Sequence, residues 1–421
     1  MKKKYIGIRW YSQRQDVVEC IIANGINVMM QDSDFGVVYC EEMHKGTKII
    51  SSNDWENSRS LPDVVKQTLS EKSIPLNDSV IIDLSKDCYN NVYETLSELG
   101  EVQELHIKVR SMIQSTFFYE NTEQRLFDKL DVLSGEIFAS INMFSGNSVI
   151  KRELCFCVKE DLSEQIMGAV NSILYEYKDK IKLEKINIKK GLYDIVLPSG
   201  RGGILIHETI GHSLEADHFF DSKNCLNSML GKKLFDTNIS ISDTCSEKDM
   251  LSYEYSADGS LVKNVDLVKK GSINGILSDQ TSSKLWSIPD TGNGRVSDYG
   301  HLIIPRMRNT FLHNGNYDKN DIFSDTYEGI YALEIGGGRT NIQTGEFVFN
   351  ILRGCLIRDG EFVGITDPFL YKGKIIDTLN KVDMIANDLS FEFGYCGKQS
   401  QLVPVSYGQP TIRVSKYRFG D

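Results

Sequence analysis

Residues 202–218 have the sequence GGILIHETIGHSLEADH, and the interpretation of the whole chain starts from them. An apolar run leads into His207 and Glu208, and His212 follows five residues after the first histidine. A neutral imidazole is a good zinc ligand, and a carboxylate beside it can deprotonate a metal-activated water. The stretch therefore indicates a hydrolytic metal site with Glu208 as the base.

The five-residue spacing between His207 and His212 sets a condition on the local structure. At about 100° per residue, five steps place the two rings roughly 140° apart on a regular α-helix, too far to share one ion. A π-helical turn has an i→i+5 repeat, and Gly211 makes such a distortion easier. The sequence thus predicts a π turn if the site is real. The alternative is two ordinary histidines on an amphipathic helix.

Composition limits the class of protein. The 421 residues are 41% hydrophobic and 25% charged, as in globular proteins of two or three domains. We find neither a signal peptide nor an apolar run long enough to span a bilayer, so we expect a cytoplasmic protein with no membrane association. The net charge of −11 argues against nucleic-acid binding. The nine cysteines form no C-x-x-C pair, and we expect most to be reduced, buried thiols.

The first 180 residues carry alternating strand and helix patterns. Residues 1–60 and 104–158 predict strands, with a hairpin connection at 32–36. Residues 61–72, 88–101 and 161–180 carry helical signals, and the last of these helices is expected to cover the preceding sheet.

After about residue 184, glycine and β-forming residues increase. Residues 262–277 predict two strands around Gly271, and Asp359-Gly360 predicts a tight hairpin because both positions accept a positive φ. We predict an α+β fold with an N-terminal α/β layer domain over 1–185. The second domain, 186–421, is expected to be β-rich and mostly antiparallel, and to carry the metal-motif helix.

A catalytic zinc site needs a third protein ligand. Spacing alone leaves these candidates: Glu215, Asp217, His218, Cys225, His301 and Cys396. We rank Cys396 first, because its flanking glycines allow close backbone approach and Lys398 would favour a thiolate. The alternative for Cys396 is a packed thiol in a turn.

Several motifs, taken in order between residues 190 and 415, resemble the TldD/PmbA family of zinc metallopeptidases. Besides residues 203–217 they are TGNGR (291–295), PRMRNT (305–310), GGG (336–338), GEFVF (345–349), MIANDL (384–389), CGK (396–398), VPV (403–405) and GQPT (408–411). The resemblance implies Zn²⁺ on His207, His212 and Cys396, Glu208 as catalytic base, and the metal-bearing TldD type of subunit. It is weak over residues 1–180, where the family usually has a helical segment before its first strands.

The resemblance also implies a function and partners. We expect a zinc-dependent peptidase for short or unfolded peptides, including the maturation or degradation of ribosomally made peptides, with water activated by zinc and Glu208. We expect a homodimer, or a heterodimer with a metal-free family member. Candidates for stabilising the oxyanion are Tyr299, His301 and Arg306, each with a structural hydrogen bond as the alternative. Residues 336–338 would pair a substrate strand or form a tight turn.

Two other functions remain open from the sequence. The first is a non-catalytic, zinc-containing subunit that binds a peptide or protein. A fourth protein ligand, Asp217 or His218, would close the metal site and favour it. The second is a nucleic-acid-linked regulator, which the acidic composition disfavours.

Overall fold

The structure is a computed structural model. It describes residues 5–23, 26–43, 46–52, 86–120, 123–143, 146–156, 162–180, 182–236, 238–245, 251–298 and 301–420. The predicted helix over 61–72 lies outside these residues. Among them, no helix is both long and apolar enough to cross a bilayer.

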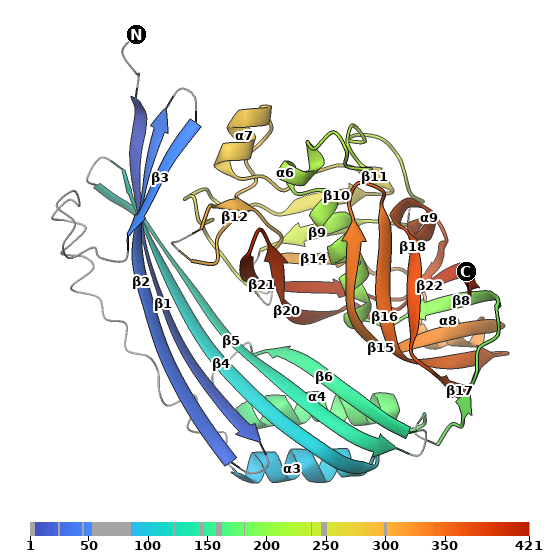
Figure 1. Ribbon diagram of the computed structural model, residues 1–421. Coiled ribbons are helices and arrows are strands. Elements are labelled where there is room, and N and C mark those ends of the chain that lie inside the picture. The colour runs from blue at the N-terminus through green and yellow to red at the C-terminus, as the bar shows by residue number, and fades with distance from the viewer. Residues whose placement is uncertain are drawn as a thin grey trace.

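The N-terminal part forms one long antiparallel sheet. Its strand order is β3-β2-β1-β4-β5-β6. The strands are β1 (Tyr5–Ala23), β2 (Ile26–Met43), β3 (Gly46–Ser52), β4 (Glu101–Glu120), β5 (Glu123–Met143) and β6 (Gly146–Cys155). The sheet curves along its length, and the remaining sheets lie on its concave side (Figure 1). The strands predicted in 1–60 and 104–158 are therefore confirmed for the residues that the structure describes, and 53–60 and 157–158 lie outside them.

The predicted hairpin at 32–36 is wrong. Strand β2 runs through this polar stretch without a turn, and Asp34 and Gly36 pair with Gln15 and Gln13 of β1. A turn would give up the backbone hydrogen bonds that β1 supplies along this whole length. Turn-forming side chains therefore do not end the strand here.

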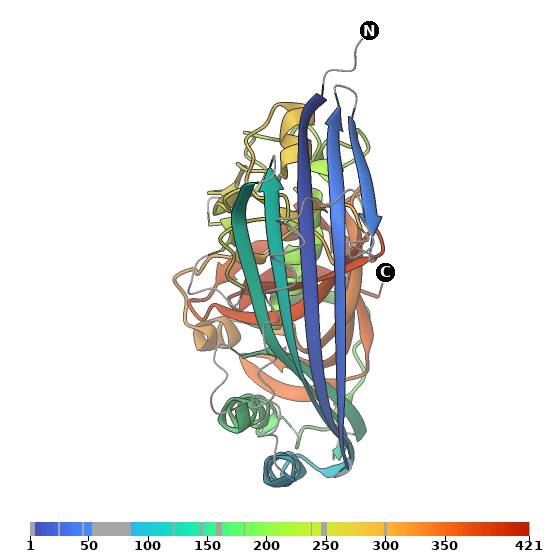
Figure 2. The same ribbon diagram turned by 90° about the vertical axis from the view of Figure 1, so that its left-hand side faces the viewer.

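Helices α3 (Lys86–Ser97) and α4 (Leu162–Tyr177) pack on the long sheet. The covering position was predicted for 161–180, and the helix predicted over 88–101 ends at Ser97, four residues before β4 begins. Their apolar faces bury Val92, Leu96 and Ile166 against sheet residues such as Ile107 and Ile137. Seen from the side, the two helices lie next to each other near the lower end of the sheet (Figure 2).

The C-terminal part contains two larger sheets and a small ribbon. The eight-stranded sheet has the order β19-β22-β8-β15-β16-β17-β7, with β18 also on β16. Its strands are β7 (Lys185–Ile186), β8 (Gly191–Leu197), β15 (Glu328–Asn341), β16 (Glu346–Arg358), β17 (Glu361–Thr366), β18 (Phe369–Lys374), β19 (Val382–Ile385) and β22 (Ile412–Phe419).

The second C-terminal sheet has six strands in the order β11-β10-β9-β14-β21-β20. They are β9 (Ile241–Thr244), β10 (Val265–Lys269), β11 (Ser272–Ile273), β14 (Asn309–Leu312), β20 (Ser390–Lys398) and β21 (Gln401–Gln409), and the ribbon is β12 (Gly294–Arg295) with β13 (Ile304–Pro305). Short helices connect the strands: η1 (Arg201–Gly203), α5 (Ile204–Ile206), η2 (His207–Gly211), α6 (Ala216–Phe219), α7 (Gln280–Trp286), α8 (Lys319–Ser324) and α9 (Ile375–Leu379).

Most strand pairs in the C-terminal part are antiparallel, and the fold is α+β, as predicted. The parallel pairs among the described strands are β8 with β15, β7 with β17, and β14 with β21. The hairpin predicted at Asp359-Gly360 joins β16 to β17, with φ of 49° and 82° at the two positions. Gly271, with φ 81°, joins β10 to β11. The division at 185/186 stays a prediction.

The eight-stranded sheet separates two hydrophobic cores. Along β15, Tyr331 and Leu333 face the core built with α3, α4 and the long sheet. Ile330 and Ala332 face the other core, which contains the apolar residues of the 204–219 segment. Alternation along the strand thus places the metal-motif helices on the face away from α3 and α4.

Candidate metal centre

Glycine allows the metal-motif segment to lie directly on strand β21. A Cβ at Gly203 would come within 2.6 Å of the carbonyl carbon of Gly408, so any side chain there would displace one backbone from the other. Strand β21 pairs with β20, which carries Cys396 opposite Val403. This close approach therefore brings Cys396 into the region of the two histidines.

The segment His207–Gly211 is a π-helical turn, as the five-residue spacing predicted. The backbone N–H of His212 donates to the carbonyl of His207, which is the i→i+5 bond of a π turn. The two imidazole rings lie edge to face, with centroids 5.0 Å apart and an interplanar angle of 81°. A Cβ at Gly211 would lie 1.9 Å from Sδ of Met307, so glycine is the residue that fits this turn.

Cys396 joins the two imidazoles. Its Sγ lies 3.3 Å from Nε2 of His212, and the ligand atoms of His207, His212 and Cys396 all lie within 4.8 Å of one another. Burial raises the pKa of the Cys396 thiol, but His207 and His212 outweigh burial and lower it to about 4. The sulfur is therefore a thiolate at neutral pH, the form that binds metals.

This donor set fits zinc. With Zn–N near 2.1 Å and Zn–S near 2.3 Å, tetrahedral geometry puts nitrogen and sulfur ligands about 3.6 Å apart, close to the Cys396–His212 contact. Nδ1 of His207 is buried and has no hydrogen-bond partner in the described part of the chain. Two nitrogens and one sulfur leave a fourth position, which is the pattern of catalytic zinc sites.

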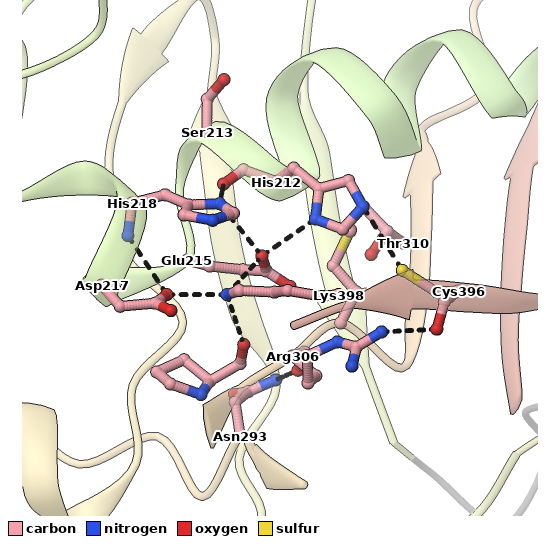
Figure 3. A network of polar contacts seen from close by, with 12 residues as sticks. His212, Ser213, Glu215, Asp217, His218, Asn293, Arg306, Thr310, Cys396 and Lys398 are labelled. Carbon is pink, nitrogen blue, oxygen red and sulfur yellow. Dashed lines mark hydrogen bonds and ion pairs between the residues drawn. The ribbon is translucent and has the colours of Figure 1, made fainter. Parts of the chain in front are cut away.

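Glu215 and Lys398 lie on the side of the His212 ring that is opposite Cys396 (Figure 3). Nδ1 of His212 donates to Oε2 of Glu215 at 2.9 Å, so its Nε2 is the nitrogen directed at Cys396. Lys398 donates to the same Glu215 oxygen at 2.9 Å and to Asp217 at 2.7 Å. Burial raises the pKa of Glu215, but Lys398 and His212 outweigh it and hold this pKa well below its ordinary value.

The role expected for Lys398, that of favouring a thiolate at Cys396, changes accordingly. Its ammonium neutralises Glu215 and Asp217, whereas the imidazoles are the groups that lower the pKa of Cys396. Side chains two positions apart on a strand point to the same face. The Cys396-Gly397-Lys398 spacing was therefore the signal that could have placed Lys398 on the same face of the strand as Cys396.

The other candidate third ligands lie away from the His207–Cys396 pair. His218 donates to the backbone oxygen of His212 at 2.9 Å and lies on the Glu215 side. His212, Glu215 and His218 also come within 4.8 Å of one another, but the Lys398 ammonium already binds the Glu215 oxygen there. Neither Asp217 nor His218 joins the first cluster, so neither supplies it with a fourth ligand.

Cys225 and His301 also lie elsewhere. Cys225 is beside Gly345, and His301 pairs with Asp298 with a side chain about a third exposed.

Glu208 follows His207 on the π turn and is half-buried. Within the described residues its carboxylate has no hydrogen-bond partner. The Tyr407 ring lies 5.8 Å from that of His207. Burial and nearby carboxylates, including Glu208, raise the pKa of Tyr407 well above its ordinary value, so its hydroxyl stays a proton donor.

The structure describes two of the three residues proposed to stabilise the oxyanion, Arg306 and His301. Arg306 is fully buried, and its Nη2 donates to the Cys396 carbonyl at 2.6 Å, so it supports the backbone of the strand. Its own carbonyl accepts from Asn293 at 3.0 Å. His301 pairs with Asp298, and Tyr299 lies outside the described residues.

Comparison with known proteins gives a family match. Residues 190–421 match the family model described as the PmbA/TldA metallopeptidase C-terminal domain. A metalloprotease TldD homolog of Haemophilus influenzae is 30% identical over 265 residues, which is 61% of this chain and 55% of that protein. A zinc metalloprotease TldD homolog of Saccharolobus solfataricus is 28% identical over 358 residues, 80% of this chain and 79% of that protein. The chain spans about half the length of the Haemophilus and Buchnera relatives that it matches.

A solved structure shares the whole fold. The crystal structure of TldE from Thermococcus kodakarensis superposes with a TM-score of 0.76 at 13% identity, covering 98% of this chain and 96% of that one. At this identity the likeness concerns the fold alone. It extends over the long sheet, where the sequence resemblance was weak.

Proposed function

The chain belongs to the PmbA/TldD metallopeptidase family, and from that premise we propose that it is a zinc-dependent peptidase acting on short or unfolded peptides. One observation carries the proposal: His207, His212 and Cys396 converge within 4.8 Å, and Glu208 follows His207 on the same π turn. The zinc metalloprotease name of the Saccharolobus relative supports zinc as the metal.

The roles follow from the donor set. Zinc, when bound, polarises the peptide carbonyl and acidifies the attacking water. His207, His212 and Cys396 would hold it. Glu208 accepts the proton of the water at its carboxylate and returns it to the leaving amine. The Tyr407 ring lies 5.8 Å from that of His207 and its hydroxyl stays protonated, and we propose this hydroxyl as a donor to the developing oxyanion.

The glycine run supports binding of an extended peptide. Residues 336–338 lie on β15, which packs against η2. Of the described strands, β8 pairs with β15 only at 329–331, so β15 beyond Tyr331 pairs only with β16. A peptide could add to the free side through backbone hydrogen bonds. Such binding depends little on side chains and suits unfolded segments, including ribosomally made precursors.

We also propose that the active species is a dimer, of two such chains or with a metal-free family member. Mass measurement together with metal analysis of the purified chain tests this. One zinc per chain in an active homodimer would show that no second subunit is needed.

The Glu208→Gln variant tests the catalytic proposal. We expect zinc content to stay unchanged and cleavage of an unstructured peptide to fall about 10²–10⁴-fold, the usual contribution of a general base. Zinc is measured by elemental analysis and cleavage by mass spectrometry. Glu346→Gln, at a largely exposed surface pair with Lys374, is the matched control and should cleave normally.

Normal cleavage by Glu208→Gln would contradict the proposal, because the activity would then arise elsewhere. Full zinc occupancy with no cleavage by the wild-type chain, alone or with a metal-free family member, would favour the non-catalytic binding subunit.

A further inference from the structure

A cavity of about 200 Å³ lies where strands β20 and β21 approach the long sheet. Tyr395 lines it, and Cys396 is the next residue on the same strand. Because successive side chains on a strand point to opposite faces, the cavity lies behind β20, across the strand from the Cys396 sulfur. It is therefore a separate space from the metal cluster, adjacent to it through one strand.

Three arginines from distant parts of the chain line this cavity: Arg110, Arg295 and Arg308. Arg110 comes from β4 of the long sheet, with its guanidinium 5.7 Å from the centroid of the Tyr395 ring. Arg295 and Arg308 lie 5.0 and 5.1 Å from the centroid of the Tyr253 ring. Two tyrosine rings thus position three cationic groups around one space.

The described residues supply no carboxylate ion pair to these three guanidiniums. Arg295 donates to neutral oxygens, the carbonyls of Met307 and Pro404, each at 2.6 Å. Nη2 of Arg308 donates to the carbonyl of Gly292. Nε and Nη1 of Arg308 and Nε of Arg110 are buried and have no hydrogen-bond partner in this part of the structure.

The carboxylates close by are engaged differently. Asp243 is buried and accepts from the backbone N–H of Arg308 at 2.8 Å and from Thr310 at 2.7 Å. Asp298, which lines the cavity, accepts from His301 at 2.9 Å. The carboxylate of Asp243 is a single charge, whereas the buried arginines beside it number at least two, Arg295 and Arg308.

This excess of buried positive charge has a cost that an anion would offset. Charged groups removed from water are unfavourable unless they are paired. Burial and the neighbouring Arg308 and Arg306 lower the pKa of Arg295, as expected where positive charge is not balanced. The planar guanidinium is suited to carboxylates, which it binds with two parallel hydrogen bonds.

We propose that this cavity is a subsite for a carboxylate of the peptide substrate, with Arg110 and Arg308 as its donors. The identity of the ligand as a peptide rests on the proposed function. The volume is below that of usual small-molecule pockets, about 300–1,000 Å³, and suits one terminal or acidic residue. The carboxylate comes from the C-terminus of the peptide or from an Asp or Glu side chain.

Peptide binding to the zinc-loaded Glu208→Gln variant of the whole 421-residue chain tests the subsite. Three labelled peptides of one sequence are compared by fluorescence anisotropy: one with a free C-terminus and no acidic residue, its C-terminal amide, and that amide with one residue replaced by Glu. We expect the first, the third or both to bind about tenfold more tightly than the neutral amide, as one charge-assisted contact would give. Comparing them separates the two sources of the carboxylate.

Arg110→Met should abolish this preference and leave the affinity for the neutral amide unchanged. Arg358→Met, at an exposed surface arginine 3.9 Å from Glu328, is the matched control and should keep the preference. Unchanged melting temperature and zinc content confirm that Arg110→Met is folded, and Arg110→Lys, which retains the charge, should retain part of the preference.

Equal binding of all three peptides by the wild-type cavity would overturn the proposal, as would a preference that survives Arg110→Met. Displacement by inorganic phosphate without any carboxylate preference would also overturn it. Cleavage is measured separately on the Glu208-containing protein. Failure of the peptidase proposal therefore shows as absent cleavage, and failure of the subsite shows as absent discrimination.

Discussion

Glu215 fixes the tautomer and the orientation of the His212 ring. Its carboxylate is fully buried, and its Oε2 accepts from His212 at 2.9 Å and from Lys398 at 2.9 Å. A carboxylate behind a ligating imidazole fixes the tautomer and ring orientation and increases the basicity of the ligand. Lys398 makes this buried charge tolerable, because an unpaired carboxylate would be costly there.

Glu215→Gln should weaken zinc binding about 10–100-fold, the usual effect of losing such a partner. The amide keeps the shape of the side chain but cannot balance Lys398 or hold the imidazole by charge. A competition titration against a chelator measures the affinity. Glu328→Gln, at a partly exposed surface glutamate, is the control. Unchanged zinc affinity in Glu215→Gln would show that His212 is oriented by packing alone.

The sequence singled out the residues that the structure brings together, but not the residues that support them. Adjacent His207 and Glu208 identify a local motif, and Cys396 ranked first among the third ligands. Its meeting with His212 depends on the β20–β21 pairing, 184 residues further along the chain, which no local spacing encodes. Arg306 donates to a backbone carbonyl, so its residue type alone could not separate this role from oxyanion binding.

At the scale of the element, the π turn depends on space as well as on hydrogen bonding. Gly211→Ala would place a Cβ 1.9 Å from Sδ of Met307. We expect the turn to shift, with a loss of about 1–3 kcal/mol of stability from overpacking and weaker zinc binding. Urea unfolding and chelator competition measure the two effects.

A second substitution and a control separate the clash from other causes. In the Met307→Ala background, Gly211→Ala should cost less, because the sulfur is gone. Gly168→Ala, in the exposed middle of α4 with open space at its Cβ, should stabilise the protein by about 0.5–1 kcal/mol. An equal cost of Gly211→Ala in both backgrounds would rule out the Met307 contact as its source.

Local sequence signals predicted an element correctly where that element requires a particular backbone conformation. Asp359 and Gly360 both adopt positive φ, and the i→i+5 spacing of His207 and His212 requires a widened turn. The stretch 32–36 has turn-forming residues but does not require a turn conformation, because strand β1 pairs with its backbone along the whole stretch. Composition alone therefore could not separate a turn from a polar strand interior.

At the scale of the molecule, buried charges join the long sheet to the eight-stranded sheet. Arg152 of β6 donates to both carboxylate oxygens of Glu334 on β15, at 3.0 and 2.6 Å. Tyr177 of α4 donates to the same carboxylate at 2.6 Å. Residues 182 positions apart show no pattern in the sequence, so this junction could not be predicted.

The Glu334→Gln variant should show how much the ionised Glu334 contributes to the free energy of unfolding, because this contribution depends on pH. Burial raises the pKa of Glu334, but Arg152 and Arg201 outweigh it, so its folded pKa lies below its ordinary value. A lowered pKa means that the ionised group stabilises the fold above its unfolded pKa, near 4.3, and that this contribution is lost as the pH falls through the folded pKa.

We therefore expect Glu334→Gln to lose about 3 kcal/mol at pH 7, since it breaks a buried pair whose side chains are 6% and 4% exposed. The difference from the wild type should shrink as the pH falls below about 4.3, where Glu334 of the unfolded chain is protonated, and should vanish below its folded pKa, where the native carboxylate is neutral too. Urea unfolding at a series of pH values measures both. Glu346→Gln, at an exposed pair, should follow the wild-type curve. A Glu334→Gln curve that stays parallel to the wild type down to low pH would mean that Glu334 stabilises the junction by its shape and not by its charge.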